Sequence, residues 1–535
     1  MYKYKGFILS VRNIFVVTSI VSILAVIIIS FSWSTVLWSL LLIIPLVLLG
    51  IWDIIQTKRA VLRLYPVIGH IRYMMESIRP EIQQYFVESD IDGRPISREF
   101  RSLVYRRAKG KRDTIPFGTL FNTYEDGYEW MGHSIYPVHI EKRNLRVRFG
   151  GSECTQPYEA SPLNISAMSY GSLSKTAIKA LNSGAQKGNF AHNTGEGGVS
   201  PYHLECGGDL IWQIGTGYFG CRNEKGGFDS DQFSETAKLD NVKMIEVKLS
   251  QGAKPGHGGI LPAEKLTQEI ADIRHVPMGA DVISPSAHTE FSGPQGLLVF
   301  VKQLRELSGG KPVGFKLCIG RKSEFLSICK AMVETGIKPD FITVDGGEGG
   351  TGAAPVELTN SVGTPLREGL SFVHAALIGF GFRDEIRLIA AGKVYSAFHM
   401  IRTMALGADT INMARGMMLA LGCIQSRSCN TDHCPTGIAT QNPDRYRALD
   451  VTDKSERVAR FHKANITHLV ELLEAAGIHT LEEIQPHLLM RRIDNQTVKS
   501  FAELYPQLTS GCLLSSETAP TDWAVDLEMA SADKW

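Results

Sequence analysis

The chain has 535 residues, and its 56 Lys and Arg against 55 Asp and Glu give a formal net charge of only +1. This balance argues against a dedicated nucleic-acid-binding protein, which carries a basic excess. Hydrophobic residues make up 44% of the chain and charged residues 21%, which excludes global disorder and a coiled coil. Nine cysteines are too few, and odd in number, for a disulfide scaffold. The sequence predicts a large, folded and reduced protein.

The first feature along the chain is an uncharged stretch over residues 13–52. Two apolar runs, 14–31 and 36–52, fill it, and each approaches the ~20 residues that a helix needs to cross a bilayer. Both flanks are basic, so the positive-inside rule puts both ends in the cytoplasm. These basic residues are Lys3, Lys5 and Arg12 before the runs and Lys58, Arg59 and Arg63 after them. We therefore expect a transmembrane helical hairpin over residues 1–60, with both termini and the soluble part cytoplasmic.

Two other interpretations of this stretch exist. A signal peptide is disfavoured because no small-residue cleavage site follows the first run and a second apolar run comes at once. Buried core helices of a soluble protein are the other alternative. With no charge inside the runs, a hairpin would anchor the chain to a lipid membrane rather than form a transport path.

Residues 61–150 are charged and aromatic, and we expect them to form a juxtamembrane accessory segment. A basic patch over residues 106–109 can contact anionic lipid, although an ordinary solvated face is the interpretation we favour.

Short β-branched runs then alternate with helix-like stretches such as 295–307, 324–335 and 397–406. The expected strands are 164–169, 190–194, 211–215, 244–249, 313–317, 341–344, 386–390 and 410–413. Eight strands that alternate with helices predict an α/β protein with a closed (β/α)₈ TIM barrel. We place this barrel at residues 151–480, with a C-terminal tail over 481–535 that packs on it.

The loops that follow these strands are unusually rich in glycine and small polar residues. They lie at 168–174, 192–198 and 251–259, after the first, second and fourth strands. Dense glycine costs chain entropy and indicates that a ligand lies against the backbone. Because a barrel carries its chemistry at the carboxyl ends of its strands, these loops predict the functional site.

Three further positions suit a flavin. Lys316 ends the fifth strand between apolar neighbours, and a cation at a barrel mouth stabilises an anionic ring or an oxyanion. Gly392 follows the seventh strand and Arg415-Gly416 the eighth, where barrels often bind phosphate. Such a barrel can hold FMN.

One motif is interpreted as a decoy. The spacing Gly347-x-Gly349-x-x-Gly352 matches a dinucleotide fingerprint, which needs a helix directly after it. Pro355 and the polar run to Pro365 break such a helix.

Three cysteines fall within twelve residues, at Cys423, Cys429 and Cys434. Thiolates this close in sequence suit a soft metal or an iron–sulfur cluster over 423–434. A zinc site with His433 as fourth ligand is an alternative, but adjacent His433 and Cys434 would strain to share one metal. Coincidence is the remaining alternative.

Five segments together resemble the FMN-binding barrel of glutamate synthase large subunits. They are residues 167–174, 193–198, 251–256, 345–353 and 421–441, and the resemblance runs in the same order over about 150–475. It implies an enzyme that acts on CH–NH2 donors, with FMN beside a [3Fe-4S] cluster on Cys423, Cys429 and Cys434. The implied reaction reduces 2-iminoglutarate, formed from 2-oxoglutarate and ammonia, to glutamate, with electrons from a donor protein or a reductase subunit.

The resemblance also implies site residues. It gives Glu196 and Lys254 catalytic roles, and Gln251, Lys254 and Arg274 contacts with substrate. The implied cofactor-binding residues are Met168, Ser169, Gly171, Lys316, Asp345, Gly346, Gly347, Gly392, Arg415 and Gly416.

The chain also departs from the family pattern. Residue 2 is Tyr where the family has a glutaminase nucleophile, so we expect no glutaminase of its own. His257 and Ile260 stand where the family usually has glutamate and glutamine. These departures favour an alternative, an FMN oxidoreductase that acts on a different amino or N-alkylamino acid. A non-catalytic membrane-tethered relic is a second alternative, but it would not need the three cysteines together with Lys254, Lys316 and Glu196.

Overall fold

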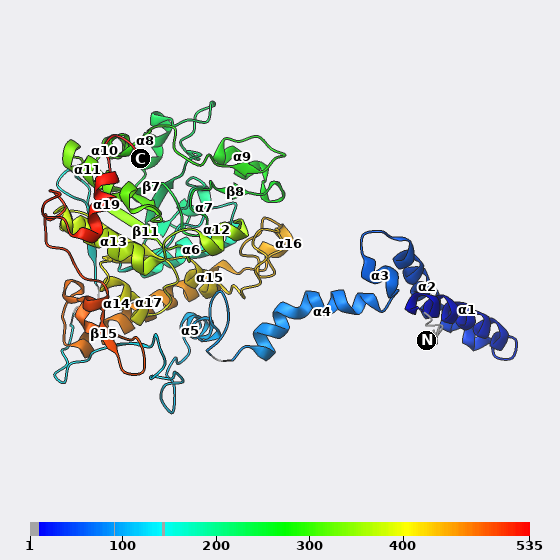
Figure 1. Cartoon of the computed structure of the whole chain (residues 1–535). Coiled ribbons are helices and arrows are strands. Elements are labelled where there is room, and N and C mark those ends of the chain that lie inside the picture. Colours follow the sequence, from blue (N-terminus) through cyan, green and yellow to red (C-terminus); the bar gives the residue numbers. More distant parts are fainter. Residues whose placement is uncertain (1–9, 90, 142–144) are drawn as a thin grey trace, which may run out of the picture. The chain divides into compact units, whose positions relative to one another are not determined.

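The computed structural model describes residues 10–89, 91–141 and 145–535 of the chain. The chain divides into two compact units, Met1–Gly93 and Arg94–Trp535. Figure 1 shows the elements of each unit.

The first unit is helical. Its elements are α1 (Val11–Ser30), a 3-10 helix (Ser34–Ser39), α2 (Leu40–Ile55), α3 (Ala60–Leu64), α4 (Gly69–Ile82) and a π-helical turn (Gln83–Val87). Val11–Ser30 and Ser34–Ile55 are long and apolar enough to cross a membrane, with mean hydropathies of 2.5 and 2.4 and only 6% of each buried. By length and composition these helices are candidate membrane spans, in the place that the sequence predicts.

Close contacts join α1 to α2 and α2 to α4. A Cβ atom on Gly50 would lie 2.0 Å from Cζ of Phe15, so glycine lets α2 approach α1 closely. Asp53, in the last turn of α2, is fully buried. Its carboxylate accepts hydrogen bonds from the Val67 backbone N–H at 2.9 Å and from Nε2 of His70 at 2.9 Å. The carboxylate thus ties the start of α4 to the end of α2.

The second unit contains the predicted barrel. Eight strands close it in the order β4-β5-β6-β7-β10-β11-β12-β13, and all neighbours are parallel. The strands are β4 (Leu163–Ile165), β5 (His192–Asn193), β6 (Leu210–Ile214), β7 (Val242–Lys248), β10 (Val313–Leu317), β11 (Phe341–Asp345), β12 (Arg387–Ala391) and β13 (Thr410–Met413). The predicted fold class is confirmed.

Helices follow the strands around the barrel. They are α6 (Lys175–Gly188), α7 (Pro201–Leu204), α8 (Ser230–Ala237), α10 (Pro294–Leu307), α11 (Lys322–Thr335), α13 (Leu366–Gly379), α14 (Ala397–Met404) and α15 (Arg415–Leu421). After β11, α12 (Val356–Ser361) begins only beyond Pro355, so no helix directly follows the glycine spacing of the decoy motif. The loop after β7 carries the antiparallel pair β8 (Ile260–Leu261) and β9 (Val282–Ile283) and the helix α9 (Gln268–Arg274).

The remaining elements surround the barrel. They are α5 (Arg98–Ala108), β1 (Glu129–Met131), β2 (Val147–Phe149), β3 (Tyr158–Ala160), α16 (Pro443–Tyr446), α17 (Val451–Ala476), β14 (Leu489–Arg492), β15 (Val498–Ser500), α18 (Phe501–Leu504), α19 (Thr521–Met529) and short 3-10 turns at Ala263–Lys265, Leu481–Glu483 and Pro486–Leu488. Phe149 of β2 packs edge-on against Phe341 at the start of β11, with ring centroids 5.8 Å apart. The β2–β3 hairpin therefore lies against the amino-terminal ends of the strands and leaves the carboxyl ends for the site.

A polar layer crosses the barrel interior at Glu246 of β7. This fully buried carboxylate accepts hydrogen bonds from Asn193 Nδ2 at 2.8 Å and Gln213 Nε2 at 2.6 Å. It also accepts one from Thr343 Oγ1 at 2.5 Å, so it joins β5, β6, β7 and β11. A buried donor that loses its acceptor lowers the stability of the folded state. Because this one carboxylate serves donors on three neighbouring strands, it helps to hold the four strands in register.

We expect Glu246→Ala to lower the melting temperature of the full-length protein. Each of the three donors would lose its acceptor, at a cost of about 1–3 kcal/mol for each group left unsatisfied. Thermal unfolding followed by circular dichroism measures the effect, and Glu235→Ala on the exposed side of α8 is the control. Equal melting temperatures for the two variants would contradict this role of Glu246.

Candidate functional site

Two buried lysines lie side by side at the carboxyl end of the barrel. Lys248 of β7 and Lys316 of β10 are partners in the strand register. Nζ of Lys248 lies 2.9 Å from Oε1 of Glu196, and Nζ of Lys316 lies 3.1 Å from Oδ2 of Asp345. Both lysine side chains are less than a tenth exposed. Each buried cation therefore has its own carboxylate.

The carboxylates keep Lys316 charged. Burial lowers the pKa of Lys316, but Asp345, Glu246 and Glu196 together outweigh burial and raise that pKa above its ordinary value. Lys316 is therefore a fixed ammonium at the mouth of the barrel.

Glu196, after β5, is surrounded by cations. Burial raises the pKa of the Glu196 carboxyl, but Lys248, Arg274 and Lys254 outweigh burial and hold the pKa below its ordinary value. Glu196 is thus an ionised carboxylate at neutral pH. The geometry suits it to attract a cation or to orient a donor N–H.

Arg274 ends α9 and turns back into the site. Its Nη2 donates to the backbone carbonyl of Tyr170 at 3.0 Å, and its guanidinium lies 5.1 Å from the ring centroid of Phe219. Its Nε is buried and has no hydrogen-bond partner in the described part of the chain. Burial lowers the pKa of Arg274 to about 10, which leaves the side chain charged.

Lys254 is 2% exposed and lies near the same carboxylate. Burial lowers the pKa of Lys254 to about 8; the Lys248 cation also lowers it, and Glu196 opposes the shift. A desolvated lysine with this pKa can bind an anion or transfer a proton near neutral pH.

The loops between these side chains touch backbone to backbone. The Gly252 N–H donates to Oδ2 of Asp345 at 3.1 Å, and a Cβ atom on Gly252 would lie 1.6 Å from the carbonyl oxygen of Gly346. A Cβ atom on Gly195 would lie 2.7 Å from the backbone N of Ser169. Glycine is required at both places. In the first of these loops, Nε2 of Gln251 is buried without a partner among the described residues, although buried amides ordinarily find one.

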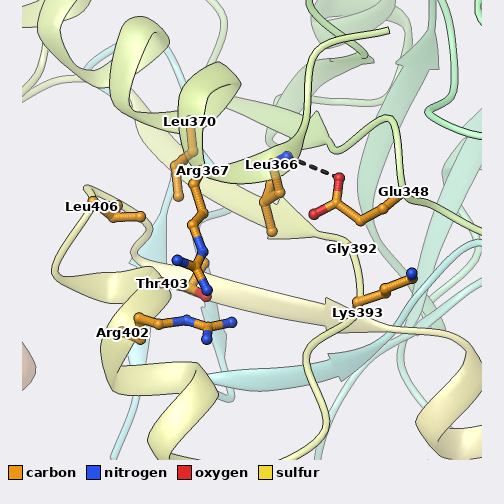
Figure 2. A pocket seen from close by; sticks show the side chains of 9 residues that line it. All are labelled: Glu348, Leu366, Arg367, Leu370, Gly392, Lys393, Arg402, Thr403 and Leu406. Carbon is orange, nitrogen blue, oxygen red and sulfur yellow. Dashed lines mark hydrogen bonds between the residues drawn. The ribbon is translucent and has the colours of Figure 1, made fainter. Parts of the chain in front are cut away.

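The residues predicted to bind the FMN phosphate also lie at the carboxyl ends of the barrel strands. Gly392 follows β12 with a φ of +150°, and Arg415 opens α15 and donates from Nη2 to the Glu348 carbonyl at 2.8 Å. A cavity of about 190 Å³ adjoins Gly392. Its lining is Glu348, Leu366, Arg367, Leu370, Gly392, Lys393, Arg402, Thr403 and Leu406 (Figure 2).

The charges around this cavity are partly matched. Figure 2 shows the guanidinium groups of Arg367 and Arg402 close together and Lys393 on the Gly392 side. Glu129 of β1 pairs with both arginines, at 2.9 Å from Arg402 Nη1. Residues before the barrel thus help to fix the helices that flank the predicted phosphate site.

The three predicted cluster cysteines are free thiols in the segment after α15. Burial is the main reason that the pKa of Cys423 is raised to about 12, and the nearby thiols of Cys429 and Cys434 add to the shift. The described residues hold no group of three or more His, Cys, Asp or Glu side chains that could bind one metal ion. This finding argues against the zinc alternative, in which all ligands bind one ion. It does not argue against a cluster, because each thiolate of a cluster can bind a different iron.

Lys265 holds the cysteine loop in place through hydrogen bonds. Its 2% exposed side chain donates to the carbonyls of Ser172 at 2.7 Å, and of Cys429 and Ala439 at 3.3 Å each. It joins the cysteine loop to the loop after β4. The hydroxyl of Tyr105 on α5 adds a hydrogen bond to the Cys423 carbonyl at 2.6 Å.

The positions that depart from the family pattern also lie next to the site. His257 and Ile260 flank two glycines, and a Cβ atom on Gly259 would lie 2.3 Å from Oε1 of Glu196. The loop that carries both departures therefore contacts the central carboxylate.

The structure brings the predicted substrate residues Glu196, Lys254 and Arg274 together and puts Lys316 beside Lys248. Met168, Ser169 and Gly171 lie in the loop after β4, and Asp345, Gly346 and Gly347 at the end of β11. Sequence reasoning missed Lys248 and Lys265. The alternation Glu246-x-Lys248, which puts both side chains on one face of β7, could have indicated the first.

Residues 132–479 match the family model described as the conserved region in glutamate synthase. The chain belongs to the glutamate synthase family. It is 36% identical over 500 residues to the glutamate synthase large subunit-like protein YerD of Bacillus subtilis, which covers 85% of this chain and 95% of that protein. It is 34% identical over 359 residues to the archaeal glutamate synthase (NADPH) of Methanocaldococcus jannaschii, with 67% of this chain and 66% of that enzyme covered.

A third relative is the archaeal-type glutamate synthase (NADPH) of Thermotoga neapolitana, 33% identical over 325 residues, with 61% of each chain covered. This chain thus spans just under two thirds of these two archaeal-type enzymes. Glutamate synthases are oxidoreductases that act on CH–NH2 donors. Among solved structures, a flavocytochrome b2 mutant aligns over 81% of this chain and 98% of its own, at 13% identity with a TM-score of 0.42.

We expect Lys265→Met to loosen the cysteine loop. Three carbonyls would lose a charged donor, and hydrogen bonds to charged groups contribute about 1.5–3 kcal/mol. Hydrogen exchange followed by mass spectrometry should show at least tenfold faster exchange in peptides from 423–441. Lys302→Met, at an exposed position of α10, is the matched control, and unchanged exchange in Lys265→Met would contradict the role assigned to Lys265.

Proposed function

We propose that the barrel binds FMN at its mouth and catalyses reductive amination of 2-oxoglutarate, through 2-iminoglutarate, to L-glutamate. The electrons would come through an iron–sulfur cluster from a separate donor protein or reductase subunit. Membership of the glutamate synthase family supports the class of reaction. The observation that carries the proposal is the ionised Glu196 among three buried cations, Lys248, Lys254 and Arg274.

The residues present fit FMN. Gln251, to which the resemblance gives a substrate contact, offers a buried amide N–H without a partner in the described part of the chain, and the polar edge of a flavin can accept it as well. Gly252, Gly346 and Gly195 let the loops around the mouth pack backbone to backbone, and Lys316 supplies a fixed positive charge. Gly392, Arg415 and Gly416 would hold the phosphate. FMN, when bound, supplies hydride and one-electron chemistry, and a nearby cation favours its reduced anionic form.

The chain's own residues then bind and orient the substrate. 2-Oxoglutarate carries two carboxylates, and Lys254 and Arg274 are two cations that can each pair with one. Arg274 keeps Nε free for such a pair, since among the described residues that atom has no partner. Buried cations of this kind bind a dianion tightly because little water competes with them.

Glu196 and Lys254 divide the proton chemistry. The lowered pKa of Glu196 makes it a poor proton donor at neutral pH, so we assign it the orientation of ammonia or of a protonated imine. The pKa of Lys254, lowered to about 8, makes it the better proton donor. The resemblance implies catalytic roles for both residues and does not divide the tasks between them.

The cysteine segment fits a cluster by the chemistry of its donors. Cys423, Cys429 and Cys434 are free thiols; Cys434 is buried and the other two are partly buried. Burial raises the pKa of Cys423 and of Cys429, and Cys434 adds to both shifts, as expected for thiols close together. Soft sulfur donors at this spacing suit iron–sulfur chemistry, and we propose a [3Fe-4S] cluster.

A second candidate substrate class follows from the loop with the departures. Gly259 contacts Glu196, so the change to Ile260 next to it removes a polar group close to the substrate region. An amino or N-alkylamino acid with a less polar side chain would suit that change.

We also propose that Val11–Ser30 and Ser34–Ile55 form a membrane hairpin with both ends cytoplasmic. The two helices are almost wholly exposed and apolar, and basic residues flank them on both sides.

We expect Cys429→Ser to lower bound iron and acid-labile sulfide to near background. Serine oxygen is a poor ligand for iron–sulfur clusters, so losing one thiolate should disassemble the cluster. Cys512→Ser is the matched control and should keep the wild-type content. Unchanged iron and sulfide in Cys429→Ser would rule the assignment out.

The substrate assignment is tested with FMN-loaded, chemically reduced full-length protein, which should convert 2-oxoglutarate and ammonium into glutamate. Lys254→Ala should weaken 2-oxoglutarate binding ten- to a hundredfold, the effect of losing a charge-assisted bond of about 1.5–3 kcal/mol, with flavin content unchanged. Glutamate formation and ligand-induced shifts of flavin absorbance are the two measurements. Turnover of another amino acid pair, with 2-oxoglutarate ignored, would favour the second substrate class.

The pH dependence gives a further check. Only protonated Lys254 pairs with a carboxylate, and its pKa in the free enzyme is about 8. The apparent Kd for 2-oxoglutarate should be flat below about pH 8 and rise about tenfold per pH unit above it. In Lys254→Arg this rise should vanish, because arginine stays charged; a rise that persists there would show that another group titrates.

A further inference from the structure

The helix α4 and the π-helical turn after it carry an exposed apolar face. We define this face by Ile71, Met74, Met75, Ile78, Tyr85 and Phe86, which are between 40% and 84% exposed. No described residue of the first unit buries them, whereas a soluble protein rarely leaves so continuous an apolar surface free.

The spacing of these residues along the chain supports the definition of one apolar face. Steps of three and four residues separate Ile71, Met74, Met75 and Ile78, so these four lie along one side of a helix with 3.6 residues per turn. Tyr85 and Phe86 follow in the π-helical turn. Arg72, Glu76 and Arg79 lie beside the apolar face and line one shallow pocket with Met75 and Ile82. Arginines there can extend their charged ends toward water while their stems cover apolar surface.

The contacts inside the unit fix where α4 begins and how it is rotated. Asp53, at the end of the second candidate span, bonds Val67 and His70. Arg59 lies 4.5 Å from the ring centroid of Tyr73, which is on the side of α4 away from the apolar face. The helix therefore starts at the level where the candidate span ends, and its apolar face stays uncovered.

We propose that the apolar face of α4 lies in the headgroup region of a lipid bilayer, so that α4 is an interfacial helix beside the hairpin. An amphipathic helix with a continuous apolar side buries that side at the boundary between headgroups and acyl chains. Continuity with the hairpin favours lipid as the occupant, since Trp52 and Ile55 at the end of α2 are exposed apolar residues at the same level. The proposal rests on the hairpin proposed above and is independent of the barrel's chemistry.

The test uses full-length protein in phosphatidylcholine–phosphatidylglycerol vesicles, with the photoreactive residue p-benzoylphenylalanine in place of Ile78 or, as matched control, of Glu76. Both positions are exposed on the same helix. After irradiation, mass spectrometry should find at least tenfold more lipid adduct at position 78 than at position 76. Vesicle flotation of both variants is measured first.

Each outcome of this experiment supports or overturns a stated part of the proposal. Protein that fails to float overturns the hairpin and this proposal together. Protein that floats but shows equal lipid labelling at the two positions overturns the interfacial helix alone. Protein that floats and joins position 78 to a second copy or to the barrel also overturns it, and identifies the occupant as protein.

Discussion

Two buried lysines side by side are the constraint on which the rest of the site depends. Lys248 and Lys316 repel each other in a region from which water is largely excluded, so each needs a nearby carboxylate. Asp345 supplies one and also accepts the Gly252 N–H, which fixes the loop carrying Gln251 and Lys254. Glu196 supplies the other and lies close to Lys254 and Arg274. The ion pairs thus position the loops as well as balance the charge.

This arrangement limits the chemistry. A site with surplus buried cations and an ionised Glu196 favours a dianionic substrate and a cationic nitrogen, as an oxo acid and ammonia provide. The same cations shift proton donation toward Lys254, because the carboxylate is held deprotonated while the lysine is close to losing its proton. A family assignment alone does not give this division of labour, which follows from burial and charge.

The barrel was predictable because most of its strands lie in short apolar runs and several strand ends carry small polar residues. Most site residues follow such strand ends, so their convergence followed from the topology. The sequence analysis did not single out Lys248 because this residue lies inside an apolar run that is typical of a β-strand. Lys265 and Asp53 were missed for another reason: Lys265 bonds residues far away in the sequence, and Asp53 is buried only through α4. Spacing along the chain carries no sign of either contact.

The central claim is that the mouth of the barrel holds a flavin beside an iron–sulfur cluster. The visible absorption spectrum of the purified full-length protein tests it most directly. We expect the bands of oxidised flavin over a broad iron–sulfur background, both bleached by dithionite, with FMN released on denaturation in about equal amount to protein. A colourless protein that releases no flavin, even after incubation with FMN, would contradict it.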